Sequence, residues 1–315
     1  MVPSTRREFV GTAAAFAAAT VARPGLCLAS ERHMTIDFAW WALGIEADQS
    51  RAVELAVSHG FESVGARGEE LARMTDAELD ALLEQMREGG LRWGAANLPV
   101  DFRFDEERYR GSLAGLADFA RGLTRAGVSR VGTWLMPGSE TLTYRKYFDV
   151  VASRLREVAT LLDGEGLRLG LEYVGPKTSW TRLRYPFVHT LAETLELAEE
   201  IGVANVGLVL DSWHWFLAGD TVDQLRELRN EQVVAVDLND APAGIPADEQ
   251  RDGSRELPAA TGVIPIGDFL GALVAMGYDG PVRAEPFNQR LNALPDEEAT
   301  AATVAAMRKA FALLG

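Results

Sequence analysis

The sequence has little of several things that define common protein classes. Cysteine occurs once in the 315 residues, at Cys27, which excludes a disulfide within the chain and a zinc site built from thiolates. Outside the N-terminal region no apolar run reaches the roughly 18 residues that a membrane-spanning helix needs. Lysine and arginine total 31 against 46 aspartates and glutamates, a formal net charge of −15. A surface this acidic repels phosphate backbones, so nucleic acid is not an expected partner.

The first 29 residues have the pattern of a signal peptide. Paired arginines, Arg6 and Arg7, precede an alanine-rich apolar stretch over residues 11–22, and small residues lead to Ala29. A charged start, an apolar middle and a small-residue end are typical of secretion signals, and the twin arginines indicate the Tat route. The alternatives are a lipoprotein signal, which the bulky Leu26 before Cys27 disfavours, and a disordered or helical N-terminal tail.

The pattern predicts residues 1–29 as a Tat signal peptide cut after Ala29, residues 30–35 as a linker and residues 36–315 as one domain. Cleavage would remove Cys27, so the mature protein would contain no thiol. We therefore expect export to the periplasm or the extracellular space, with no stable membrane anchoring of the mature form.

Strand and helix patterns alternate through the rest of the chain. Eight strands, each followed by a helix, over about 280 residues predict an α/β fold of the (β/α)8 TIM-barrel type. The alternative is an open doubly wound sheet, but no G-x-G-x-x-G motif follows the first strand. Strands are expected at 36–43, 60–66, 91–98, 128–135, 167–174, 206–210, 233–238 and 282–285. Helices are expected at 49–58, 76–87, 106–125, 143–162, 189–201, 222–228, 266–276 and 297–313.

Four consecutive expected strands carry an acid at or near the carboxyl end: Glu172, Asp211, Asp237 and Glu285. In a barrel these ends meet at one mouth, where four unpaired carboxylates would repel one another strongly. A divalent cation resolves this, and oxygen ligands favour Mn²⁺ or Mg²⁺, with Zn²⁺ or Co²⁺ also possible. Any one of these acids alone could be a helix N-cap or an ion-pair partner.

The sequence resembles the xylose-isomerase-like TIM-barrel superfamily over nearly all of residues 36–315. The resemblance rests on Leu171-Glu172, the Asp211-x-x-His214 pair, the segment 236–240 and Ala284-Glu285-Pro286. It is closest to the sugar phosphate isomerase/epimerase branch, which includes ketose 3-epimerases and inosose dehydratases.

The resemblance implies metal ligands and catalytic residues at the same mouth. Glu172, Asp211 and Glu285 match three metal ligands, and Asp237 stands where the family has a histidine. Glu172 and Glu285 are the implied catalytic pair, moving a proton through an enediolate, while His214 hydrogen-bonds a substrate oxygen. The implied function is a metal-dependent isomerase or epimerase, and the export signal favours an unphosphorylated sugar, keto-sugar or cyclitol as its substrate.

Five further residues are candidates for substrate binding: Lys177, Trp213, Asn97, Arg251 and Phe287. Four lie near expected strand ends, and Arg251 lies in a long irregular segment. Each has a simpler alternative, because loop lysines are often solvated and most tryptophans at such positions belong to the core. The long irregular segment 241–262 follows the seventh strand and could cover the site. Within it, Arg251 and Arg255 either close over a ligand or pair with Asp252 and Glu256.

Two other functions remain open. The same enolate could expel a β-substituent, which would make the protein a lyase or dehydratase acting on a 3-keto-glycoside or an inosose. A non-catalytic exported sugar-binding barrel is the second alternative. The DNA-repair endonuclease branch of the superfamily needs additional histidines, and the second and third strands end instead in Ala66-Arg67 and Ala96-Asn97. A homo-oligomer is possible, although no feature of the sequence indicates one.

Overall fold

The computed structural model describes Met1 and residues 32–315. The signal peptide expected over residues 1–29 and its cleavage site therefore lie outside the described residues, apart from Met1. Within the described part of the chain, no helix combines the length and the apolar character needed to cross a bilayer.

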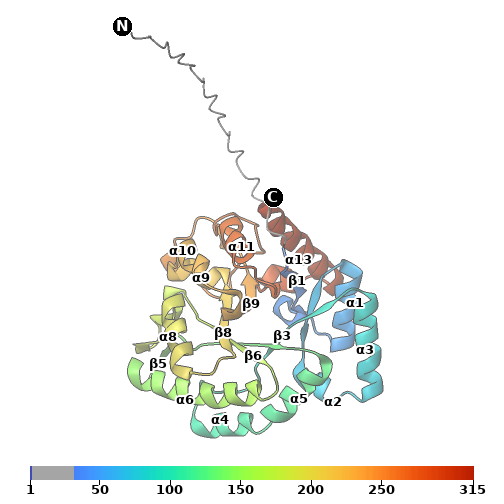
Figure 1. Ribbon diagram of the computed structural model, residues 1–315, viewed down its shortest axis with the longest axis horizontal. Coiled ribbons are helices and arrows are strands. Elements are labelled where there is room, and N and C mark those ends of the chain that lie inside the picture. The colour runs from blue at the N-terminus through green and yellow to red at the C-terminus, as the bar shows by residue number, and fades with distance from the viewer. Residues whose placement is uncertain (2–31) are drawn as a thin grey trace. The chain divides into compact units, whose positions relative to one another are not determined.

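Eight parallel strands close into a barrel in the order β1-β10-β9-β8-β6-β4-β3-β2, with helices around the outside (Figure 1). The prediction of a (β/α)8 barrel is confirmed. A separate antiparallel pair, β5 (Gly138–Ser139) and β7 (Tyr185–Pro186), lies in the loops after β4 and β6. The barrel strands are β1 (Thr35–Phe38), β2 (Ser63–Ala66), β3 (Arg92–Asn97), β4 (Arg130–Trp134), β6 (Arg168–Glu172), β8 (Val206–Asp211), β9 (Val233–Leu238) and β10 (Pro281–Ala284).

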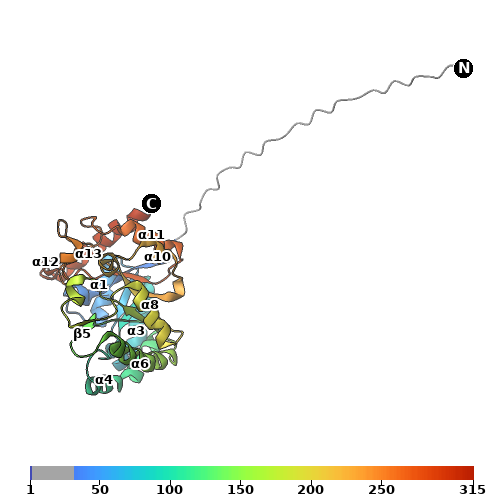
Figure 2. The same ribbon diagram turned by 90° about the vertical axis from the view of Figure 1, so that its left-hand side faces the viewer.

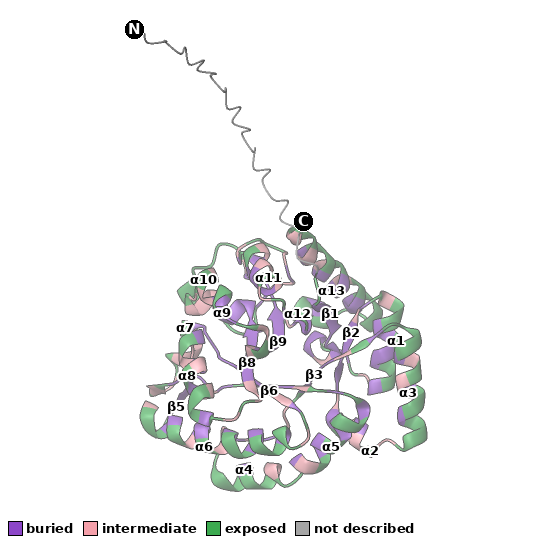
Figure 3. Cartoon of the chain, in the orientation of Figure 1, coloured by how far each residue is buried: buried purple, intermediate pink, exposed green. Residues whose placement is uncertain are grey.

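The helices bury one face against the barrel and expose the other, as Figure 3 shows in purple and green. Seen from the side, α12 and β5, which follow β10 and β4, lie toward one edge of the molecule (Figure 2). The α-helices are α1 (Gln49–His59), α2 (Gly68–Arg73), α3 (Asp76–Glu88), α4 (Glu106–Leu113), α5 (Leu116–Ala126), α6 (Tyr144–Asp163), α7 (Lys177–Trp180), α8 (Leu191–Ile201), α9 (Ser212–Ala218), α10 (Val222–Arg226), α11 (Ile266–Ala275), α12 (Gln289–Asn292) and α13 (Asp296–Phe311). Short 3-10 helices are η1 (Trp40–Leu43), η2 (Asn230–Gln232), η3 (Ala247–Glu249) and η4 (Ala312–Leu314).

Two expected elements are divided in the structure. The strand expected over residues 36–43 ends at Phe38 and is followed by η1, which Gly44 closes in the left-handed conformation at φ +75°. The helix expected over residues 106–125 is broken into α4 and α5. Gly115 lowers the helix propensity at the break, and the Ser112 hydroxyl at the end of α4 accepts from the Asp101 N–H and donates to the Tyr109 carbonyl.

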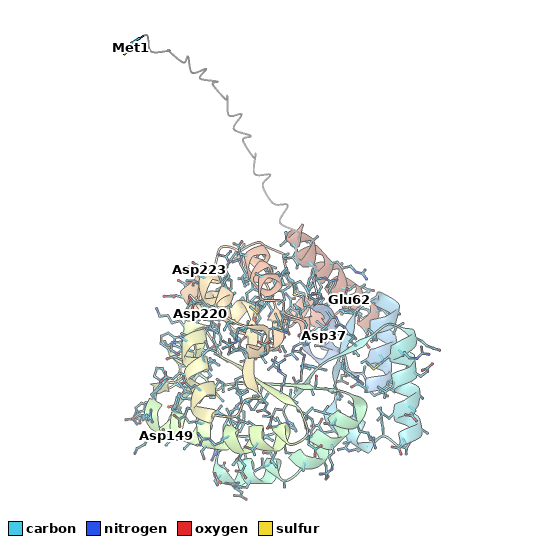
Figure 4. All side chains as sticks on the ribbon, viewed as in Figure 1. Met1, Asp37, Glu62, Asp149, Asp220 and Asp223 are labelled. Atoms are coloured by element: carbon cyan, nitrogen blue, oxygen red, sulfur yellow. The ribbon has the colours of Figure 1, made fainter. Side chains whose placement is uncertain are left out.

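A row of polar side chains crosses the interior of the barrel. Ser63, Asp37, Arg283, Asp237 and Asp211 are register partners on five neighbouring strands, and all five are buried. Register partners in parallel strands face the same side of the sheet, so this row lines the inside of the barrel. Figure 4 shows Asp37 inside the ring of helices, whereas Asp149 and Asp223 lie at the periphery. The row leads to the carboxyl ends of β8 and β9, where the acids predicted from the sequence lie.

Candidate functional site

The structure brings Glu172, Asp211, Asp237, Glu285 and His214 together at the mouth of the barrel. Glu172 and Asp211 are the last residues of β6 and β8, Asp237 lies near the end of β9, and Glu285 directly follows β10. Single ligand atoms of Glu172, Asp211 and His214 lie within 4.8 Å of one another, as do those of Glu172, Asp237 and Glu285. Glu172 belongs to both groups and is therefore the centre of the cluster.

Asn239 fixes two of the acids relative to each other. Its Nδ2 donates to Asp211 Oδ1 at 3.1 Å, and its Oδ1 accepts from the backbone N–H of Glu285 at 3.0 Å. The Ser212 hydroxyl in turn donates to the Asn239 carbonyl and accepts from the Asn239 N–H. Asp211 Oδ1 also accepts from the Trp213 N–H at 2.7 Å and caps α9. The turn after β9 thus holds the Asp211 carboxylate and the backbone at Glu285.

His214 enters the cluster from α9, a helix that the sequence analysis did not anticipate. Its Nε2 lies 3.8 Å from both Glu172 Oε1 and Asp211 Oδ2. The chain after β6 passes closely behind it, since a Cβ added at Gly175 would lie 2.2 Å from the His214 carbonyl oxygen. Burial, followed by the positive charge of Arg255, lowers the pKa of His214 to about 3, so its imidazole is neutral at ordinary pH.

Arg255 lies in the middle of this group, in contact with two of the acids at the mouth of the barrel. It comes from the segment 241–262 and is only 2% exposed. Its Nη1 donates to Asp211 Oδ2 at 2.7 Å and to Glu285 Oε2 at 3.1 Å. Its Nη2 lies 3.2 Å from His214 Nε2 and donates to Asp252 Oδ1 at 2.8 Å. One expected alternative, a pair with Asp252, is present, but the contacts to Asp211 and Glu285 have no signal in the local sequence.

A second arginine holds Asp237. Arg283 Nη2 donates to Asp237 Oδ2 at 3.0 Å, and Arg283 Nε donates to Asp237 Oδ1. Both residues are buried, at 6% and 0% exposure. The predicted metal ligand on β9 is therefore already bonded at both oxygens, and its partner Arg283 was not among the candidate residues.

The cluster has an excess of negative charge that fits a divalent cation. Burial, together with Glu285 and Asp237, raises the pKa of Glu172 well above its usual value, and burial with Asp237 raises the pKa of Glu285 to about 8. Glu172 Oε1 is buried and accepts no hydrogen bond from any described residue. Two guanidinium groups, of Arg255 and Arg283, face the carboxylates of Glu172, Asp211, Asp237, Asp252 and Glu285. Carboxylate oxygens with a neutral imidazole are a donor set that divalent metals accept.

A cavity of about 520 Å³ opens above the cluster, large enough for a small sugar or cyclitol. Its polar floor combines Glu172, His214, Glu285, Asp252 and Arg255, and Asp211 and Asp237 do not line it. Its walls include Trp134, Met136, Val174, Leu183 and Phe287, and Glu140 and Arg182 also line it. An apolar wall around a few convergent polar groups is typical of a small-molecule site.

The predicted substrate-binding residues are distributed differently. Phe287 lines the cavity, and its ring lies 4.6 Å from the Arg255 guanidinium carbon. Trp213 is fully buried in the core. Lys177 begins α7, and its Nζ bonds Asp248 Oδ2 at 2.6 Å on the surface. Asn97 and Arg251 line two other depressions of the surface.

Comparison with known proteins places the site in context. A family model described as xylose isomerase-like TIM barrel matches residues 53–310. An inosose isomerase of Bacillus velezensis is 25% identical over 253 residues, which are 78% of this chain and 86% of the relative. A 3-dehydroshikimate dehydratase of Pseudomonas aeruginosa is 30% identical over 148 residues, but these are 46% of this chain and 22% of the relative. A crystal structure of IOLI protein with a binding zinc atom superposes with a TM-score of 0.74 at 21% identity, covering 90% of this chain and 99% of the other, which shows the shared fold.

Proposed function

The chain belongs to the xylose isomerase-like TIM barrel family, and from that membership we propose that it is a divalent-metal-dependent isomerase or epimerase of an unphosphorylated sugar, keto-sugar or cyclitol. Its relatives include an inosose isomerase. The observation that carries the proposal is the pair Glu172 and Glu285 on the floor of one cavity, with strongly raised pKa values. Carboxyl groups whose pKa is raised above the usual range are suited to accept and return protons.

The two glutamates supply the proton transfer. Glu285, with a pKa raised to about 8, and Glu172, with a pKa raised well above its usual value, share the buried floor, and the charge of Glu285 disfavours ionisation of Glu172. In the proposed reaction one of the two carboxyl groups is ionised and the other is protonated. The ionised group removes the proton from the carbon beside the substrate carbonyl, giving an enediolate, and the protonated group delivers a proton to complete the isomerisation. Arg255 lines the same cavity and donates to Glu285 Oε2 at 3.1 Å.

A divalent cation would be held around Glu172, with the remaining ligands drawn from Asp211, Asp237, Glu285 and His214. When bound, it supplies Lewis-acid polarisation of the substrate carbonyl. Mn²⁺ and Mg²⁺ are the ions that an oxygen-rich site favours, and the zinc in the similar IOLI structure supports Zn²⁺ as a further candidate. The acidic floor disfavours a phosphorylated substrate, and export from the cytoplasm would also favour an unphosphorylated one.

The second candidate function is a lyase or dehydratase, in which the enediolate expels a β-substituent instead of taking up a proton. The similarity to a 3-dehydroshikimate dehydratase favours it. Both candidates begin with removal of the same proton, so both use Glu172 and Glu285.

Exchange of substrate hydrogen with solvent tests the proposal. The protein loaded with Mn²⁺ is incubated in D₂O with ketohexoses, 3-keto-glycosides and inososes, and the carbon-bound hydrogens are followed by NMR. We expect deuterium next to the carbonyl with at least one substrate, and loss of exchange by about 10²–10⁴-fold in Glu172→Gln and Glu285→Gln. A new alkene product would identify the lyase. A melting temperature that changes when sugar is added, with no deuterium exchange in any substrate, would identify a sugar-binding barrel and overturn the proposal.

We also propose export by the Tat route, with the mature protein in the periplasm or outside the cell. The proposal rests on Arg6, Arg7 and the apolar stretch after them. The variant R6K/R7K should keep the precursor in the cytoplasm, and the N-terminus of exported wild-type protein should follow Ala29. Unchanged export of the variant would contradict this route.

A further inference from the structure

We propose that the cation at this site is bound by Glu172, Asp211 and the imidazole of His214, and that Asp237 is not a ligand. The inference rests on the proposed metal dependence and goes further, because it decides whether His214 or Asp237 binds the cation together with Glu172. The Glu172–Asp211–His214 set supplies two carboxylates and one nitrogen. The Glu172–Asp237–Glu285 set supplies three carboxylates. The two arginines of the site decide between them.

Arg283 cannot release Asp237 easily. The two residues are register partners on β10 and β9, both are buried, and Arg283 bonds both carboxylate oxygens. Arg283 Nη1 already has no hydrogen-bond partner among the described residues. Freeing Asp237 for a metal would leave the other donors of this buried guanidinium unpaired as well, which is costly in a dry barrel interior.

Arg255 can be released, because it carries its own counter-ion. It lies on the irregular segment 241–262, not on a barrel strand, and its Nε and Nη2 both bond Asp252 Oδ1, at 3.1 and 2.8 Å. Movement of the segment would withdraw Arg255 and Asp252 as a neutral pair. The backbone at Arg255 and Glu256 is anchored, since Glu256 exchanges two backbone hydrogen bonds with Asp240 and Asn288 Nδ2 donates to the Arg255 carbonyl at 3.0 Å. Withdrawal is therefore a swing of the Arg255 side chain together with the preceding turn that carries Asp252.

Withdrawal of Arg255 exposes a ready nitrogen ligand. A guanidinium can only donate, so the contact from Arg255 Nη2 at 3.2 Å means that His214 Nε2 is the acceptor and presents a lone pair to the cluster. This atom lies 3.8 Å from Glu172 Oε1 and from Asp211 Oδ2. A small contraction would bring these three atoms within reach of one cation. Glu172 Oε1, buried and accepting nothing from the described residues, is the acceptor that such an ion would satisfy.

The selected set changes the expected metal. An imidazole ligand moves the preference from Mg²⁺ toward Mn²⁺, Co²⁺ and Zn²⁺. It also makes Arg255 a competitor of the metal, since the guanidinium uses Asp211 Oδ2 and His214 Nε2 while it remains in place.

Mn²⁺ bound to the metal-free protein provides a test that does not depend on activity. Pulsed EPR should show coupling of the Mn²⁺ spin to a directly bonded ¹⁴N nucleus in the wild type, and the protein has only four histidines in total. In His214→Gln the coupling should vanish, and the Mn²⁺ affinity measured by calorimetry should fall by more than about 100-fold. That exceeds the loss of roughly 10–100-fold that is typical when a residue that only hydrogen-bonds a metal ligand is changed. Arg255→Gln should bind Mn²⁺ about tenfold more tightly than the wild type. This is the change expected if Arg255 blocks the metal ligands in about nine-tenths of the wild-type molecules.

The matched control is the double variant D237N/R283Q, which removes both charges of the other pair together and should bind Mn²⁺ as the wild type does. Circular dichroism melting checks that each variant is folded. The inference would be overturned if folded His214→Gln kept the nitrogen coupling. It would also be overturned if the folded double variant lost Mn²⁺ binding while His214→Gln kept it. If Mn²⁺ binds without His214 and a substrate still exchanges, the inference fails and the isomerase proposal survives. If Mn²⁺ binds through His214 and no substrate exchanges, the proposed function fails and the ligand assignment survives.

Discussion

Asp237 and Arg283 form a closed ion pair inside the barrel, although they are 46 positions apart in the sequence. Burying one charge without the other is far more costly than burying neither. Arg283→Met should therefore lower the free energy of unfolding by about 3–5 kcal/mol, measured by urea denaturation.

The double variant D237L/R283M is the control for this pair. It replaces both charges by apolar groups and should regain most of the stability that Arg283→Met loses. Wild-type stability in Arg283→Met alone would mean that Asp237 becomes neutral or finds another partner, and the pair would then be dispensable.

The acidic cluster should make the metal-free protein less stable as the pH rises from about 7 to 8.5. The pKa of Glu285 is near 8 in the folded protein against 4.5 ordinarily, so the folded state binds more protons in this range and the stability falls as they leave. The expected loss from this one group is about 1 kcal/mol. His214, with its pKa lowered to about 3, acts in the opposite sense, but only below its ordinary value of 6.5.

Thermal melts of metal-free protein across this pH range measure the effect. Glu285→Gln should have a flatter profile than the wild type, and saturation with Mn²⁺ should flatten the wild-type profile because the bound ion keeps the carboxylates ionised. A wild-type profile that rises between pH 7 and 8.5 would contradict the raised pKa of Glu285.

The barrel and the convergence of the acids were accessible from the sequence, because both depend on local patterns. A short apolar run that ends in an acid predicts a buried strand and a carboxylate at its carboxyl end, which is how Glu172, Asp211 and Glu285 were found. The arginines that bond these acids could not be predicted from the sequence. Arg255 reaches Asp211 across 44 positions and Arg283 reaches Asp237 across 46, and nothing near either arginine marks which acid it meets.

Loop candidates were the least predictable part of the site. Lys177 and Arg251 follow strands that end at the mouth, which is why the sequence favoured them for substrate binding. In the structure Lys177 bonds Asp248 on the surface and Arg251 lines a separate depression, whereas Trp134 and Arg182 line the cavity. The loop to which a residue belongs determines at which end of the barrel it lies, but not the direction in which its side chain points.

Gly175 offers a way to disturb His214 without touching any acid. A Cβ at this position would lie 2.2 Å from the His214 carbonyl oxygen and 3.0 Å from the Ala218 nitrogen, so Gly175→Ala must push α9 away from β6. We expect a loss of about 1–3 kcal/mol in stability together with weaker Mn²⁺ binding by calorimetry. Gly271→Ala on α11 is the matched control, because its Cβ would meet no atom within 4 Å and alanine favours the helix. Wild-type Mn²⁺ affinity in Gly175→Ala would mean that the position of α9 does not matter to the cluster.

Asn239 is expected to act as a positioning residue through Asp211 and Glu285. In Asn239→Asp the Nδ2 donor to Asp211 Oδ1 is replaced by a second carboxylate, while the shape and the acceptor for the Glu285 N–H remain. The two facing carboxylates then repel, which raises the pKa of Asp211 further and weakens it as a ligand. We expect Mn²⁺ affinity to fall by about 10–100-fold, with recovery as the pH is raised, whereas a purely structural defect would lower the melting temperature at every pH without restoring binding. Calorimetric titration at two pH values separates these outcomes, and an affinity equal to that of the wild type at both would show that Asn239 does not hold Asp211 in place.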